Sequence, residues 1–179
     1  MPLEGRMPTI ERGQDGVTTE YSDVAVAGDG VERLLTELFS EHWDKLTVGP
    51  LIEGAAYEIR FAARPTVTML DGYLTVDTGI WHFHLCVNDH RGAPTAELAQ
   101  VRRVARAAFF RSDGDSCSPS TWGLRLWNGR GEQMITVFFP SPFYDHETDA
   151  RRREPDWTRT ALWEALRARW TTGPVPAGA

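Results

Sequence analysis

The stretch from Ile80 to Val87 constrains the fold more than any other part of the sequence. Its side chains alternate in character, and successive side chains of a β-strand point to opposite faces. One face carries three side chains that can bind metals, and the other is wholly apolar. These two sets are His82, His84 and Cys86, and Trp81, Phe83, Leu85 and Val87. The stretch therefore predicts a strand that packs on the core with one face and presents chemical groups on the other.

Alternating segments joined by short links predict further antiparallel strands. Residues 66–70 and 73–77 flank Asp71-Gly72, a pair of residues typical of tight hairpins. Residues 122–127 and 134–139 predict a second hairpin. A period of two also begins at Ala55.

Three segments have apolar residues at three- and four-residue steps, which predicts three helices. The first covers about residues 29–43, with Asp29 as its cap, and the second about residues 95–111. The third begins at Asp156 or Thr158. This order of elements favours an α+β fold, with an antiparallel sheet of about five to six strands and three helices packed mainly on one face.

The chain is expected to form one domain with two loose ends. Residues 1–27 are polar, contain several Gly and Pro residues and lack a sustained period, so they predict a flexible N-terminal arm. Residues 28–172 hold the predicted strands and helices and form the single α+β domain. Residues 173–179 predict a frayed C-terminal tail.

Composition narrows the classes of partner. A net charge of -6 argues against general affinity for nucleic acid. No apolar run approaches the ~20 residues that cross a bilayer, and the N-terminus lacks an apolar signal segment. With two cysteines a disulfide framework is not expected, although a Cys86–Cys117 bridge is left open. The sequence predicts a cytoplasmic protein whose partners are a small-molecule ligand and, in a homo-oligomer, a second copy of itself.

The predicted strand at residues 82–86 is the first candidate site. His82 and His84 would project to one side with Cα atoms ~6.6 Å apart, so both imidazoles can reach one ion. The third ligand would come from Cys86, His90 or Glu132. Nitrogen and sulfur donors favour Zn²⁺ or Fe²⁺ over Mg²⁺. Two alternatives remain: Cys86 as a nucleophile activated by a neighbouring His, or both His satisfied by neighbours beside an inert core Cys86.

Arg125 and three tryptophans are the second set of candidates. Arg125 alternates with leucines in a predicted strand, where an inward-facing charge needs a partner or an anionic ligand. Glu132 is its expected partner across the turn, and with Arg125 and Cys86 it makes up the expected catalytic groups. Trp81, Trp122 and Trp127 would line a cavity for a flat cofactor or ligand, or else belong to the core.

Residues 81–86, 122–129 and 138–143 together resemble a family of bacterial proteins of unassigned function. The resemblance runs from about residue 30 to 170 and implies a small standalone protein without a known reaction. The stretch around His82 and His84 is also locally similar to plant-type magnesium dechelatases, which act on chlorophyll. That similarity implies that these two residues match the His-x-His strand motif of the dechelatases.

These observations favour a metal-dependent enzyme that acts on a small molecule, with Arg125 as a clamp if that molecule is anionic. The first alternative is a binding protein, or a dechelatase-like enzyme, for a planar tetrapyrrole held by His and Trp. The second alternative is a structural or interaction domain without catalytic activity.

Overall fold

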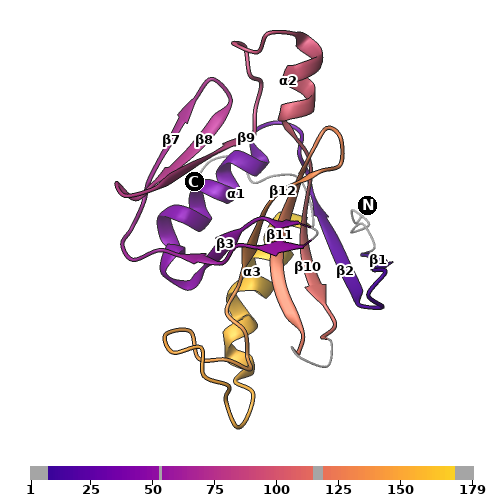
Figure 1. The fold of residues 1–179 in the computed structure, drawn as a ribbon, viewed down its shortest axis with the longest axis vertical. Helices are drawn as coiled ribbons and strands as arrows, with labels where there is room; N and C mark the ends of the chain where they lie inside the picture. Colours follow the sequence, from indigo (N-terminus) through magenta and orange to yellow (C-terminus); the bar gives the residue numbers. More distant parts are fainter. Residues whose placement is uncertain (1–7, 53, 115–118, 172–179) are drawn as a thin grey trace, which may run out of the picture.

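A computed structural model of the protein describes residues 8–52, 54–114 and 119–171 (Figure 1). Its centre is a seven-stranded sheet in the order β1-β2-β10-β11-β12-β3-β6, with every neighbouring pair antiparallel. These strands are β1 (Thr9–Arg12), β2 (Thr18–Val24), β10 (Val104–Ser112), β11 (Thr121–Asn128), β12 (Gln133–Phe138), β3 (Thr47–Gly49) and β6 (Ile59–Arg60). The expected α+β fold with an antiparallel sheet is confirmed. The C-terminal tail and Cys117 lie outside the described residues.

Two smaller sheets flank the large one. A three-stranded antiparallel sheet has the order β7-β8-β9, and β4 pairs with β5. Their bounds are β7 (Thr66–Leu70), β8 (Tyr73–Asp77), β9 (His82–Cys86), β4 (Leu51–Ile52) and β5 (Ala55–Ala56). The turn between β7 and β8 is the predicted one, because Asp71 and Gly72 both take the positive φ that a tight hairpin requires.

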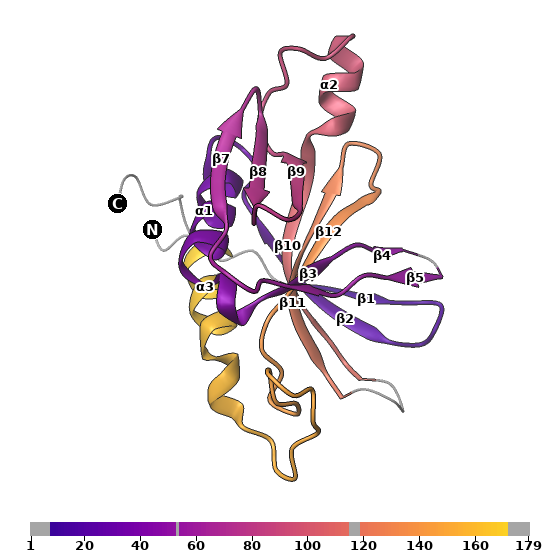
Figure 2. The same ribbon diagram turned by 60° about the vertical axis from the view of Figure 1, so that its left-hand side comes forward.

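The helices are α1 (Gly30–Glu41), α2 (Ala96–Arg102) and α3 (Ala161–Thr171). Figure 2 shows α1 and α3 on the same side of the seven-stranded sheet, while the β1–β2 and β4–β5 hairpins project on the opposite side. Short 3₁₀ turns at Trp43–Lys45 and Trp157–Thr160 follow α1 and precede α3. None of the helices in the described part of the chain is long and apolar enough to cross a bilayer.

Helix α1 lies at the centre of the main core. Its apolar residues recur at helical spacing, and Leu34, Leu35, Leu38 and Phe39 are fully buried. One core cluster joins them to apolar side chains of the three-stranded sheet, the seven-stranded sheet and α3. Asp29 precedes the helix as expected, but its side chain makes no capping hydrogen bond because its backbone is not in the extended conformation of an N-cap.

Strand β9 has the two faces that the sequence predicts. Leu85 is buried in the main core, and the Phe83 ring meets Phe39 of α1 edge-on with 5.6 Å between centroids. His82 and His84 are exposed on the other face. Because the apolar face is turned toward α1, the two imidazoles point away from the main core.

The structure corrects the prediction of a flexible arm over residues 1–27 for its described part, which begins at residue 8. Residues 9–12 and 18–24 form β1 and β2, and β2 pairs with the central strand β10 over six residue pairs. The sequence signal for this hairpin is Asp15-Gly16 between two short runs rich in β-branched residues. Low hydrophobicity obscured it, since β2 buries only part of its surface.

The predicted helix over residues 95–111 is wrong in its second half. Thr95 caps α2 as expected, its hydroxyl accepting from the Leu98 amide at 3.1 Å, but α2 ends at Arg102 and β10 follows. Residues 107–110 are all buried because both faces of β10 are covered. A strand buried on both faces has no period of two, and its alanines at helical steps imitate a helix.

The turn between β7 and β8 generates a stability prediction. A Cβ on Gly72 would lie 2.6 Å from the Asp89 carbonyl oxygen, whereas one on Gly79 would meet nothing within 4 Å, although both glycines have φ of 82°. Each change to Ala incurs the left-handed penalty of about 1–2 kcal/mol. The backbone clash adds at least about 1 kcal/mol for Gly72→Ala.

Denaturant unfolding of Gly72→Ala and Gly79→Ala measures that difference. Equal losses in the two variants would contradict the close approach of the turn to Asp89.

Candidate functional site

The expected site on β9 is an exposed pair of imidazoles. The His82 and His84 rings lie 5.0 Å apart at 65°, and Nδ1 of His84 lies 2.7 Å from the Thr75 hydroxyl. Neither residue lines any of the cavities that are described below. The two rings share a side, as predicted, but they stand on an open sheet surface.

Cys86 and His90 do not join the imidazole pair in a metal-ligand cluster. Cys86 is 2% exposed, its thiol donates toward the Asn88 carbonyl at 3.6 Å, and burial raises the pKa of the thiol. His90 packs edge-on against Tyr73, with Nε2 3.5 Å from an Asp71 carboxylate oxygen. Burial therefore disfavours a reactive thiolate at Cys86.

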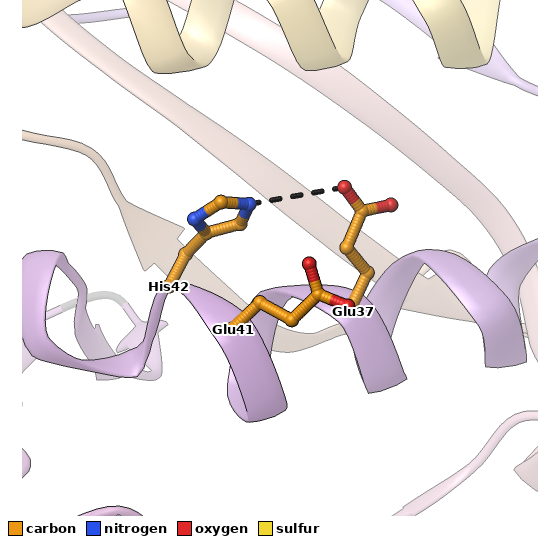
Figure 3. A group of neighbouring side chains, drawn as sticks. All are labelled: Glu37, Glu41 and His42. Carbon is orange, nitrogen blue, oxygen red and sulfur yellow. Dashed lines mark ion pairs between the residues drawn. The ribbon is translucent and has the colours of Figure 1, made fainter.

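The described residues bring three potential metal ligands within 4.8 Å of one another at the end of α1 (Figure 3). They are Glu37, Glu41 and His42. The Glu37 carboxylate already accepts a hydrogen bond from Arg169 of α3. His42 Nε2 lies 3.8 Å from the same Glu37 carboxylate oxygen. This cluster is sufficiently explained as an ion-pair network that ties α3 to α1.

A denser set of polar and aromatic side chains lies on the face of the seven-stranded sheet that is turned away from the helices. We call this surface the outer sheet face. It is made of alternate residues on the adjacent strands β2, β10, β11 and β12. The residues between them along each strand point to the other side of the sheet, where they pack into the main core. Its members are Tyr21, Arg106, Ala108, Phe110, Arg125, Trp127, Thr136 and Phe138.

Arg106 is held between two rings and two carboxylates. Its guanidinium carbon lies 4.8 Å from the Tyr21 ring centroid and 4.6 Å from that of Trp127. It donates to Asp23 at 2.9 Å and to Glu11 at 3.1 Å. Arg106 is thus a neutralised cation that links β1 and β2 to β10.

Arg125 has a different environment. Its guanidinium carbon lies 4.5 Å from the Phe110 ring centroid, and it donates to the Tyr21 hydroxyl at 2.8 Å and to Thr136 Oγ1 at 3.3 Å. Among the described residues, no carboxylate lies within ion-pairing distance of it. A half-buried guanidinium without an acidic partner is suited to bind an anion.

The expected pairing of Arg125 with Glu132 is wrong. Arg125 stands opposite Thr136 in the β11–β12 register, and Glu132 lies in the turn before β12. The Glu132 carboxylate instead accepts from Asn128 at 2.8 Å. A register shift near Trp127 sets this arrangement, which hairpin spacing alone did not indicate.

The three predicted tryptophans do not form one cavity. Trp122 and Trp127 are five residues apart on β11 and so face opposite sides of the sheet. Trp122 packs with Phe143 in the main core, Trp127 lies on the outer sheet face, and Trp81 belongs to the layer around α1. Sequence reasoning missed Tyr21 and Arg106, because it placed them in a flexible arm and a helix.

Several cavities indent the described surface. The one beside Arg125 has a volume of about 280 Å³ and is enclosed by the β1–β2 hairpin and the outer sheet face. Its lining is Glu11, Arg12, Gly13, Asp15, Val17, Thr19, Tyr21, Ser112 and Arg125. A larger cavity of about 590 Å³, between the Asp71 turn and the start of α1, is lined mainly by polar groups such as Asp29, Asn88 and Arg103.

Solved structures with a similar fold include two of the heme-binding protein ChuX. The first is 15% identical to this chain, and the match covers 83% of this chain and 76% of ChuX. The second is 13% identical, and the match covers 85% of this chain and 75% of ChuX. Both matches have a TM-score of 0.51. A protein from Erwinia carotovora is 14% identical, with a TM-score of 0.57 over 84% of this chain and 76% of its own. No curated protein sequence matches. A model of a protein family of unknown function matches residues 8–172.

These findings correct the main functional prediction. The metal-dependent enzyme is wrong: ChuX, which shares this fold, is a heme-binding protein, and no third ligand atom within the described residues joins His82 and His84. The expected membership of a family of unassigned function is confirmed. The local similarity to magnesium dechelatases stays a prediction.

Burial of Cys86 generates a prediction about its reactivity. Because its pKa is raised, less thiolate is present at a given pH than for an ordinary cysteine. In a Cys117→Ser variant, Cys86 should react with a disulfide reagent at pH 8 at least about tenfold more slowly in the native than in the urea-unfolded protein. Rapid native labelling, followed by absorbance, would instead support a nucleophilic thiol.

Proposed function

Since the chain belongs to a family of proteins of unknown function (DUF7676), we propose a function from its own geometry: it binds a tetrapyrrole of the heme class at the outer sheet face. The observation that carries this proposal is Arg125, a half-buried cation without a carboxylate partner in the described residues, set among aromatic rings. Tetrapyrroles of this class combine a flat apolar ring with acidic side groups.

The shape of the sheet supports the same ligand class. The β1–β2 and β4–β5 hairpins project from the sheet on the side of the outer sheet face (Figure 2). Exposed large apolar side chains occur on or beside the β4–β5 hairpin, with Ile52 55% and Tyr57 56% exposed. Together with the half-buried rings of Trp127 and Phe138 they offer apolar surface to a macrocycle on the outer sheet face, which favours burial of its ring surface.

The fold gives further support. ChuX is a heme-binding protein, and this chain resembles it over most of its length. At such low identity the likeness establishes the fold alone, so the location of the ligand rests on the residues of this chain. The sequence-based alternative of a planar tetrapyrrole ligand agrees with this proposal, but Arg125 and Trp127 replace the exposed imidazoles as the groups that hold it.

The remaining sequence-based inferences keep their place as proposals. We propose a cytosolic location, as expected from the sequence. We retain a second copy of the chain as a proposed partner.

The binding site can be tested by titrating the purified protein with hemin and following the visible absorption band. Arg125→Ala should weaken binding about tenfold or more, because a charge-assisted hydrogen bond contributes about 1.5–3 kcal/mol. Arg125→Lys should bind with intermediate affinity, because it keeps the charge but loses the planar fork.

The matched control is the double variant His82→Ala/His84→Ala. Both imidazoles are exposed on the other sheet, so this variant should bind hemin like the wild type. Loss of binding in the double variant but not in Arg125→Ala would place the ligand on β9 and refute the outer sheet face.

A further inference from the structure

Protein donors to heme iron are typically His, Cys, Met or Tyr side chains, and the outer sheet face is poor in them. Met69 and Met134 pack against the main core, and Cys86 is buried at the end of β9. The histidines lie on other parts of the described chain: the end of α1, β9, the loop after β9 and the loop before α3. They are His42, His82, His84, His90 and His146.

The described tyrosines are Tyr21, Tyr57, Tyr73 and Tyr144. Tyr73 lies on β8, Tyr144 lies in the loop before α3, and Tyr57 is exposed beside the β4–β5 hairpin. Tyr21 is the one on the outer sheet face, and its oxygen is already engaged. The Tyr21 hydroxyl accepts a hydrogen bond from Arg125 Nη1 at 2.8 Å. Burial raises the pKa of Tyr21, which keeps the phenol protonated at neutral pH. Iron binds a phenolate, so ligation would require both loss of this proton and rearrangement around Arg125.

The cavity beside Tyr21 has the size and charge for an acid group. Its volume of about 280 Å³ lies below the ~300–1,000 Å³ of pockets that enclose whole drug-sized ligands. Arg125 and Arg12 line it without a carboxylate partner among the described residues. The lining also holds two carboxylates: Glu11 shares Arg106 with Asp23, and Asp15 accepts the Val17 amide at 2.9 Å in the turn between β1 and β2.

The hydroxyls in the same cavity add neutral hydrogen-bonding groups. Thr19 and Ser112 both line it, and their hydroxyl oxygens lie 2.7 Å apart across β2 and β10. With Tyr21 they give three hydroxyls to a cavity that Arg125 and Arg12 also line, and Arg125 bonds directly to the Tyr21 hydroxyl. This set can bind a carboxylate by charge-assisted hydrogen bonds, while a ring too large for the cavity rests against the aromatic side chains outside it.

We infer that the outer sheet face recognises its tetrapyrrole through ionised carboxylates on Arg125 and Arg12, and not through the iron. This inference rests on the proposed function and narrows its ligand class. The ligand is a tetrapyrrole that carries free acid groups, with or without a metal. Metal-free porphyrin acid and heme are therefore bound alike, and a porphyrin whose acids are esterified is rejected.

Three probes separate the contributions of acid and metal. Quenching of tryptophan fluorescence gives the Kd of hemin, protoporphyrin IX and protoporphyrin IX dimethyl ester for the full chain. Trp127 on the outer sheet face is one of the seven tryptophans that contribute to the signal. Hemin and protoporphyrin IX should differ by less than about threefold, and the ester should bind at least about tenfold more weakly. Arg125→Ala should remove most of the difference between acid and ester.

Variants of the remaining donors complete the design. Tyr21→Phe, Tyr57→Phe, Met7→Leu and Cys117→Ser should each keep the ratio of the hemin and protoporphyrin affinities near that of the wild type. Met7 and Cys117 are included because they lie outside the described residues. Circular dichroism and thermal unfolding check that each variant is folded, and Arg125→Lys replaces Arg125→Ala if the latter is not.

The outcomes distinguish the inference from the proposed function. Binding of hemin more than about tenfold tighter than protoporphyrin IX, lost in any one of these donor variants, would overturn the inference and leave the proposed function standing. Equal binding of acid and ester would overturn it as well. If none of the three probes binds, the proposed function itself fails.

Discussion

Burial of α1 between two sheets is the constraint on which the rest of the structure depends. Leu34, Leu35, Leu38 and Phe39 are fully buried, so both the three-stranded and the seven-stranded sheet turn their apolar faces toward this helix. The polar face of each sheet must then point outward, on opposite sides of the core. For this reason the imidazoles of β9 and the guanidinium groups of the seven-stranded sheet cannot belong to one site within a single copy of the chain.

Two arginines on the outer sheet face show how neighbouring charges take different roles. Arg106 is stacked between Tyr21 and Trp127 and neutralised by Asp23 and Glu11, so its charge serves to attach the β1–β2 hairpin. Arg125, one strand further, contacts a ring and two hydroxyl groups and keeps its charge available. An anion that approaches the face therefore meets one available guanidinium beside one that is already neutralised.

Sequence reasoning succeeded where a segment has one buried face. Strand β9, the β7–β8 turn and α1 were predicted because the alternation of residues 82–86, the pair Asp71-Gly72 and the helical spacing of leucines all have local causes. It failed for β10, where burial on both faces removed the period of two. It also missed β2, a strand of low hydrophobicity that is stable only because it pairs with β10.

The sequence by itself determined the α+β class, the two faces of β9 and the unusual position of a charge at Arg125 within an apolar strand. Only the tertiary structure decided what these groups meet. Register placed Thr136 and not Glu132 opposite Arg125, and α1 turned His82 and His84 toward the surface. The physical reason is that alternation specifies which side chains share a face, whereas the neighbours of that face come from segments distant in sequence, through pairing and burial that no local pattern encodes.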